Sequence, residues 1–157
     1  MKFGKKSSEQ IKVIFLDIDG VLNNPKQWGN RFLDLRFDEE CVNQFNRIVE
    51  ATNAKIVLST SWRKLYKYDI LTKVLKDVGV RGEFIGITPA LHSLHSQRGD
   101  EINEWIKYYG RKNIDSFVVL DDDSDMDKVL GHFVKCNNDT GLTNKEVQKA
   151  IEILTHP

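Results

Sequence analysis

The feature that most constrains this chain is a short apolar run that ends in a charged turn. Ile11–Leu16 (IKVIFL) is rich in β-branched and aromatic residues, and Asp17-Ile18-Asp19-Gly20 follows it directly. A run this apolar does not suit a strand with one face in water. It is typical of a central strand in a parallel sheet that is covered on both faces. Because ligands of open α/β sheets bind at the carboxyl ends of the strands, the turn is a candidate functional site.

The rest of the chain alternates between strand and helix patterns. Two more buried strands are predicted at Lys55–Leu58 and 116–120, with shorter ones at 83–87 and 132–134. Helices are predicted after Asp38, which has the character of an N-cap, and over 69–78, 99–109 and 144–154, where Thr143 is a candidate cap of the last helix. We therefore expect an α/β fold, a three-layer α/β/α sandwich with a Rossmann-like, mainly parallel sheet. A single domain over residues 1–157 is expected, with a flexible segment at 1–10.

The composition narrows the class of protein without indicating a partner. A length of 157 residues, with 40% hydrophobic and 29% charged residues, suits one soluble globular core. The 23 acidic residues balance the 23 basic ones, so no basic excess supports nucleic-acid binding. No signal-peptide pattern and no membrane-spanning apolar run occurs, so we expect a cytoplasmic protein without a membrane partner. Cys41 and Cys136 lack metal-ligand or disulfide spacing and are predicted to be buried thiols.

Polar groups follow three of the buried strands, at the point where each strand ends. These groups are Asp17 with Asp19, the segment 59–63, and the segment 121–125. The carboxyl ends of parallel strands meet at one edge of the sheet, so the three groups are expected to converge on one site.

Carboxylates clustered in this way are unfavourable unless a cation neutralises them. Mg²⁺ prefers oxygen ligands, usually one or two carboxylates completed by water and substrate phosphate. Asp17 and Asp121 can supply the carboxylates, and Asp19 its backbone carbonyl, which leaves the Asp19 side chain free for proton transfer. Asp122 is the next candidate ligand, and Asp125 would serve if the loop turned tightly.

Hydroxyls and guanidinium groups near the same edge could hold phosphate oxygens. Ser59 and Thr60 supply hydroxyls, and Arg98 or Arg63 supplies the cation. Which of Ser59, Thr60 and Ser61 faces the phosphate depends on the register of the strand. Arg63 could instead pair with a loop carboxylate, and Trp62 is equally suited to the core or to a lid. A nucleophile, a cation, phosphate donors and an acid together meet the requirements of phosphoryl transfer.

These residues carry a resemblance to a known family. The segment 15–22 (FLDIDGVL) resembles the first motif of the haloacid dehalogenase-like phosphatases, Ser59 their second motif, and Asp121-Asp122 their fourth. More narrowly, the segments 58–63, 98–102 and 140–143 resemble a subgroup found in RNA-repair-associated proteins. The resemblance implies that Asp17 attacks phosphorus and forms an aspartyl-phosphate. It also implies that Asp19 protonates the leaving group and then activates water.

The chain departs from the family at the third motif, which usually holds a lysine. The best-placed residue is Arg98, just ahead of the helix predicted at 99–109, whereas Lys107 lies well inside that helix. Arginine keeps the positive charge but differs from lysine in reach and in hydrogen-bond geometry.

The segments that could carry a cap domain are short. Neither 23–36 nor 88–97 is long enough for a folded cap, so an open site is expected. An open site suits a nucleic-acid end or a phosphoprotein and also admits small phosphoesters. Trp28 and Phe32 are candidates for substrate contact or for anchoring their loop.

Three alternatives stay open from the sequence. The chain could be a receiver-like phosphoacceptor domain, although its middle strand ends in Ser59 where a receiver carries an aspartate. It could be a non-catalytic phosphate-binding or scaffolding module of the same fold. It could also transfer phosphate to an acceptor other than water. No sequence feature indicates an oligomeric state.

Overall fold

The sheet has the parallel architecture that the sequence predicts. The computed structural model describes residues 9–91 and 96–156. Within these ranges five strands form one sheet in the order β3-β2-β1-β4-β5, and every neighbouring pair is parallel. The strands are β1 (Ile11–Leu16), β2 (Lys55–Leu58), β3 (Phe84–Ile87), β4 (Ile114–Asp121) and β5 (Phe133–Lys135).

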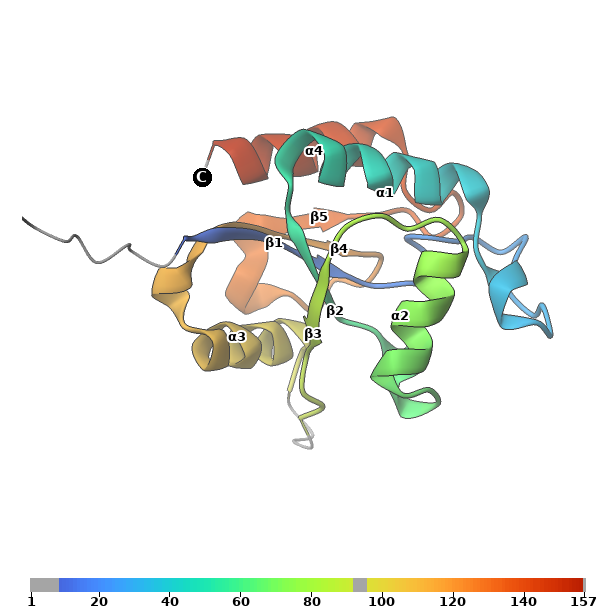
Figure 1. Ribbon diagram of the computed structural model, residues 1–157, viewed down its shortest axis with the longest axis horizontal. Coiled ribbons are helices and arrows are strands. Elements are labelled where there is room, and N and C mark those ends of the chain that lie inside the picture. The colour runs from blue at the N-terminus through green and yellow to red at the C-terminus, as the bar shows by residue number, and fades with distance from the viewer. Residues whose placement is uncertain (1–8, 92–95, 157) are drawn as a thin grey trace, which may run out of the picture.

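Helices connect the strands and cover both faces of the sheet, as Figure 1 shows. The α-helices are α1 (Glu39–Thr52), α2 (Tyr68–Asp77), α3 (Arg98–Tyr109) and α4 (Asn144–Thr155). Short 3₁₀ turns occur at Leu33–Arg36, Ser61–Lys64, Arg111–Asn113 and Asp127–His132. The predicted elements are therefore all present with bounds shifted by up to two residues, whereas the 3₁₀ turns were not predicted.

The alternation of side chains along β1 divides the core into two halves. Ile14 and Leu16 belong to the cluster formed with α1, α2 and α4, whereas Val13 and Phe15 belong to the cluster formed with α3. Because successive residues of a strand point to opposite faces, one apolar run fills both halves. This arrangement confirms the three-layer α/β/α fold.

Local capping fixes where two of the covering helices begin. Asp38 caps α1, because its carboxylate accepts a hydrogen bond from the backbone N–H of Cys41 at 3.0 Å. Thr143 and Glu146 form a capping box at the start of α4. Both starts were expected from the residue types, since side-chain oxygens at these positions satisfy the free N–H groups of the first turn.

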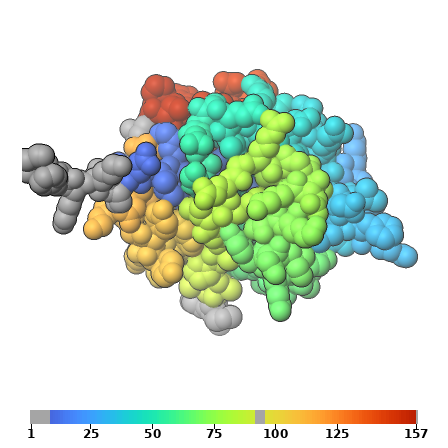
Figure 2. All heavy atoms as spheres, viewed as in Figure 1, coloured from blue at the N-terminus to red at the C-terminus, as the bar shows by residue number. Residues whose placement is uncertain are grey.

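The segment between β1 and α1 projects beyond the sheet at the right of Figures 1 and 2. Its only regular element is the 3₁₀ turn Leu33–Arg36, so no folded cap stands here. It exposes three large apolar side chains, with exposed fractions of 42% for Trp28, 64% for Phe32 and 52% for Leu35.

Other expectations concern the segments at the edges of the described ranges. Residues 1–8, which belong to the segment expected to be flexible, lie outside the described residues. The same holds for residues 92–95 in the loop expected at 88–97.

Cys41 and Cys136 are both buried free thiols, as predicted. Among the described residues, none of the helices is long and apolar enough to span a bilayer.

Candidate active site

Backbone hydrogen bonds continue past the strand ends and bring the three polar groups together. The N–H of Asp17 donates to the carbonyl of Leu120 at 3.1 Å, next to Asp121, and the N–H of Ser59 donates to the carbonyl of Leu16 at 2.8 Å. Each strand end is therefore held in register with its neighbour. The predicted convergence of these groups at one edge of the sheet is confirmed.

Three carboxylates meet at the junction of β1 and β4. One oxygen from each of Asp17, Asp121 and Asp122 lies within 4.8 Å of the others. Asp17 and Asp121 are almost fully buried, with 6% and 1% of their surfaces exposed. Asp125 is not a member of this group. Its carboxylate accepts a hydrogen bond from the backbone N–H of Arg98 at 3.0 Å.

The buried carboxylates hold their protons more strongly than ordinary aspartates. Burial, with the nearby charge of Asp121, raises the pKa of Asp17 well above its usual range, although Arg98 opposes the rise. Burial also raises the pKa of Asp121, to about 6, again against the charge of Arg98. Both shifts follow from the cost of a carboxylate charge out of water. Clustered carboxylates whose charges repel one another are suitable ligands for a divalent cation such as Mg²⁺, which would offset their negative charge.

Arg98 is the cation that faces these carboxylates. Its Nη1 lies 3.2 Å from the carboxylate oxygens of both Asp17 and Asp121 and donates to the carbonyl of Ser59 at 2.8 Å. Burial alone would lower the pKa of this guanidinium, but the carboxylates, Asp17 first, outweigh burial and raise it. Of the two cations considered for the third motif, Arg98 is thus the one that contacts Asp17. Lys107 lies on the exposed part of α3 and pairs with Glu104.

The start of α3 is fixed against the loop after β4, and this contact positions Arg98. The N–H of Gly99 donates to the carbonyl of Asp125 at 3.0 Å. A Cβ atom at Gly99 would lie 3.2 Å from the Cα of Met126, closer than a side chain normally packs. The glycine thus allows the helix to approach the loop closely enough for Arg98 to reach both carboxylates.

The carboxylate of Asp19 is held by two neighbours outside the acidic group. The indole N–H of Trp62 donates to Oδ2 at 2.9 Å, and the amide of Asn23 donates to Oδ1 at 3.0 Å. The carbonyl oxygen of Asn23 accepts from the N–H of Gly20 at 2.9 Å, which ties the same side chain to the turn. Trp62 is 6% exposed and belongs to the core, so it packs in the core and also orients Asp19.

Gly20 allows Asp122 to lie against the Asp-x-Asp turn. Its φ is +77°, a conformation that favours glycine. A Cβ atom at this position would lie 2.4 Å from an oxygen of Asp122. The turn and the acidic loop therefore fit together only with glycine here.

The structure distinguishes the three hydroxyls whose roles the sequence left open. Oγ of Ser59 is buried, and it has no hydrogen-bond partner among the described residues. Oγ1 of Thr60 accepts from the backbone N–H of Trp62 at 3.1 Å, and Ser61 is exposed. A buried hydroxyl without a partner is costly, so Ser59 is the hydroxyl best suited to meet a ligand at this edge.

Arg63 pairs with a carboxylate, which is one of the two roles that the sequence left open for it. Its Nη2 lies 2.6 Å from the carboxylate of Glu101, and its Nη1 donates to the hydroxyl of Thr88 at 3.0 Å. The sequence allows a loop carboxylate as the partner of Arg63. The carboxylate of Glu101 instead belongs to helix α3. The pair joins the 3₁₀ turn after β2 to α3, so Arg63 holds these two elements together.

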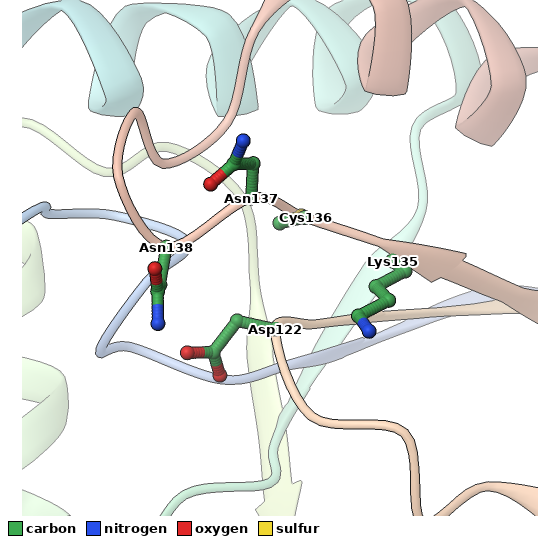
Figure 3. Close-up of a pocket in the computed structure, with 5 residues that line it drawn as sticks. All are labelled: Asp122, Lys135, Cys136, Asn137 and Asn138. Carbon is green, nitrogen blue, oxygen red and sulfur yellow. The ribbon is translucent and has the colours of Figure 1, made fainter.

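Two cavities are lined by acidic residues of the site, one by Asp122 and the other by Asp19. One, of about 440 Å³, is lined by Asp122, Lys135, Cys136, Asn137 and Asn138. Figure 3 shows the carboxylate of Asp122 and the amide of Asn138 pointing to the same side of this cavity. The other, of about 210 Å³, is lined by Asp19, Asn23, Trp28, Gly29, Arg36 and Trp62. We call the second the Asp19 pocket.

Some site contacts were not foreseen from the sequence. Asn23 and Glu101 were not singled out, although Asn23 lies close to the first motif and Glu101 lies within the segment that resembles the subgroup. An asparagine three residues after the Gly20 turn is the one local signal, since such side chains often bond nearby backbone N–H groups. The contact of Trp62 with Asp19 spans 43 residues and has no local signal.

The chain is thus a three-layer α/β sandwich with acidic residues at the ends of two adjacent parallel strands. Residues 13–147 match the family described as the HAD domain in Swiss Army Knife RNA repair proteins. The match covers most of the chain and includes every residue of the acidic group, so the chain belongs to this haloacid dehalogenase-like (HAD) family. Comparisons with curated proteins and with solved structures gave no match.

Proposed function

We propose that this chain is a Mg²⁺-dependent phosphomonoester hydrolase that acts through an aspartyl-phosphate on Asp17. Membership of the HAD family supports a phosphatase-type hydrolase. The observation that carries the finer proposal is the burial of Asp17 and Asp121 around the guanidinium of Arg98, beside the Ser59 hydroxyl, which has no hydrogen-bond partner among the described residues.

The residues fit a metal at the junction of β1 and β4. The carboxylates of Asp17, Asp121 and Asp122 and the backbone carbonyl of Asp19 would hold Mg²⁺ there. When bound, the ion would neutralise the carboxylates and the phosphate oxygens, which allows two anions to approach each other. The raised pKa values of Asp17 and Asp121 in the metal-free protein agree with a site built for a cation.

The proposed reaction has two steps. A carboxylate oxygen of Asp17 attacks phosphorus, the ester P–O bond breaks, and the Asp19 carboxylic acid gives its proton to the leaving oxygen. Water then attacks the phosphorus of the aspartyl-phosphate, Asp19 takes the proton of the water, and the bond to Asp17 breaks to release phosphate. Trp62 and Asn23 hold the Asp19 carboxylate in one orientation for both proton transfers.

Phosphate oxygens would be held by the chain itself. The hydroxyl of Ser59 has no partner in the described part of the chain, and Arg98 lies beside the nucleophile. The hydroxyl of Thr60 already accepts a hydrogen bond and can still donate its own proton to phosphate. We assign Arg63 to positioning, through its ion pair with Glu101.

The substrate class follows from the open site and the family. No folded cap stands between β1 and α1, so a macromolecular end can reach the strand ends as readily as a small phosphoester. Because the family is found in RNA repair proteins, we favour a phosphorylated nucleic-acid end over a phosphoprotein.

The direct test is hydrolysis of p-nitrophenyl phosphate with Mg²⁺. Asp17→Asn and excess EDTA should each abolish turnover. Asp123→Asn is the matched control, because Asp123 is exposed in the same acidic loop and lies outside the proposed machinery. Turnover that survives in Asp17→Asn would refute the nucleophile. A folded wild-type protein that binds phosphate and turns over no phosphoester would support the alternative of a non-catalytic phosphate-binding module.

A further inference from the structure

The general acid of a phosphatase lies between the scissile phosphate and its leaving group. Under the proposed function, the leaving group must therefore extend past Asp19, away from the carboxylates that would hold the metal. Of the two cavities described above, the Asp19 pocket is lined by this residue, whereas the larger one is lined by Asp122. The leaving group would thus enter the Asp19 pocket.

Two indole side chains form part of the wall of this pocket. Trp28 is 42% exposed, yet its indole N–H donates to the side-chain amide oxygen of Asn23 at 2.9 Å, which fixes the ring. Trp62 is buried, donates a hydrogen bond to Asp19 and also lines the pocket. A large aromatic ring that is exposed but held in one orientation is suited to stack against a planar ligand.

Arg36 gives the pocket a positive charge. Its Nε donates to the carbonyl of Asn30 at 2.6 Å, and its guanidinium carbon lies 6.0 Å from the centre of the Trp62 ring. Its two terminal nitrogens have no carboxylate partner among the described residues, so they are available to hydrogen-bond acceptors on a ligand. Gly29 leaves open space where a side chain would stand.

We propose that the Asp19 pocket binds the base of a nucleoside leaving group, with Trp28 stacking on the base and Arg36 bonding to acceptors on its edge. This inference rests on the proposed function. A base has both a flat face and ring or carbonyl acceptors, so it matches the indole and the guanidinium together. The ring of a phosphotyrosine has a flat face and no such acceptors, so it would leave Arg36 without a partner.

The test compares substrates that differ in the leaving group. The probes are adenosine 3′-monophosphate, adenosine 5′-monophosphate, phosphotyrosine and the ring-free glycerol phosphate. We expect kcat/KM for the better nucleotide to exceed that for glycerol phosphate by about tenfold or more, from the range measured for base stacking. Trp28→Ala should reduce this ratio by about tenfold, and Arg36→Met should reduce it as well.

Two further variants separate stacking from indirect effects. Trp28→Phe keeps a stacking ring but loses the N–H that bonds to Asn23, so it should retain most of the ratio. Tyr108→Ala removes an aromatic ring that is 87% exposed on α3, outside the pocket, and should leave the ratio unchanged. If Trp28→Ala reduced kcat/KM equally for glycerol phosphate and for the nucleotide, the proposal would be overturned. Such a result would show that Trp28 acts by positioning Asp19 through Asn23 and not by stacking on a base. A preference for phosphotyrosine over both nucleotides would overturn it too.

Binding of adenosine itself separates this proposal from the proposed function. Calorimetry with adenosine needs neither metal nor turnover. Adenosine binding that weakens about tenfold in Trp28→Ala would support the pocket even if no phosphoester were hydrolysed. Failure of the wild-type protein to bind adenosine would overturn the proposal even if p-nitrophenyl phosphate were hydrolysed in an Asp17-dependent way.

Discussion

At the scale of single residues, the site depends on how one arginine is shared by two buried carboxylates. Arg98 lies 3.2 Å from both Asp17 and Asp121 and is itself largely buried. Its planar guanidinium reaches a carbonyl as well as both carboxylates, which a single ammonium group would do less well. In the absence of metal, Arg98 is thus the counter-ion of the site.

This role predicts a loss of stability when the charge is removed. Arg98→Met should lower the free energy of unfolding by about 3 kcal/mol in EDTA, because two buried carboxylates lose their partner. Arg98→Lys should lower the free energy of unfolding by less, since it keeps the positive charge. Urea denaturation measures both effects. Arg31→Met, at an exposed arginine, is the control and should stay within about 0.5 kcal/mol of the wild type. An Arg98→Met protein as stable as the wild type would contradict the role of Arg98 as counter-ion.

Trp62 gives a second prediction at this scale. Trp62→Phe removes the N–H that bonds to Asp19 and keeps most of the packing, so we expect kcat to fall about tenfold through poorer proton transfer. Trp105→Phe is a matched control, because Trp105 is also 6% exposed and packs on the other face of the sheet. Similar losses of stability in both variants, with kcat reduced in Trp62→Phe alone, would confirm the positioning role. Equal kcat values in the two variants would refute it.

At the scale of elements, the residues that could be predicted from the sequence are those with a local signal. The apolar runs marked the strands, and Asp38 and Thr143 marked two helix starts, because strand burial and capping depend on neighbouring residues. The ion pair of Arg63 with Glu101 joins residues 38 positions apart. This pair depends on where α3 packs, which no local pattern gives, so the sequence left open whether Arg63 binds phosphate or pairs with a carboxylate.

The cap of α1 also ties the helix to the loop after the first motif. The carboxylate of Asp38 accepts hydrogen bonds from the side-chain amides of Asn24 and Gln27, both at 3.2 Å, besides the one from Cys41. Partial burial would raise the pKa of Asp38, but these hydrogen bonds outweigh burial and lower it. A carboxyl with a lowered folded-state pKa contributes stability above its unfolded-state pKa, and this contribution is lost as the pH falls through the folded-state value.

Replacing the cap should therefore have a pH-dependent effect. Asp38→Ala should cost about 1 kcal/mol at pH 7, and the difference from the wild type should shrink as the pH falls below about 4. Asp38→Asn keeps a capping oxygen and does not titrate, so it should cost less. Denaturation at several pH values measures this. A cost of Asp38→Ala that did not shrink in acid would show that the carboxylate charge does not contribute.

At the scale of the whole molecule, the fold places charge where only a cation or protons can balance it. Five parallel strands bring Asp17, Asp121 and Asp122 to one edge, and the covering helices keep water from two of them. The sequence predicts this convergence because it follows from the topology of a parallel sheet. Only the structure shows that the Ser59 hydroxyl has no partner in the described part of the chain while Thr60 accepts a hydrogen bond, since this depends on register and on the turn that begins at Ser61.

The raised pKa values predict how protons and Mg²⁺ compete. Asp121 has a folded-state pKa of about 6, above its unfolded-state value, so the folded protein binds the extra proton between about pH 4 and pH 6. The metal-free protein should therefore lose stability as the pH rises through this window. At pH 5 Mg²⁺ must displace the proton of Asp121, whereas at pH 7.5 this proton has already been lost. A fixed concentration of Mg²⁺ should therefore raise Tm more at pH 7.5 than at pH 5.

Thermal unfolding with Mg²⁺ and with EDTA at the two pH values measures this competition. Asp121→Asn removes a proposed Mg²⁺ ligand together with the group that titrates in this window, so it should reduce the Mg²⁺-induced Tm shift at pH 7.5. A Tm shift as large at pH 5 as at pH 7.5 would contradict a metal site built on these carboxylates.

The central claim, that Asp17 carries the phosphoryl group, is tested most directly by trapping the intermediate. The protein would be mixed with Mg²⁺ and a phosphoester in a single turnover, quenched in acid and digested, and the modified peptide located by mass spectrometry. We predict a phosphoryl group on the peptide that contains Asp17, and none in Asp17→Asn. Phosphoryl transfer to another residue, or turnover by wild-type protein in which no phosphorylated peptide can be trapped, would contradict the account.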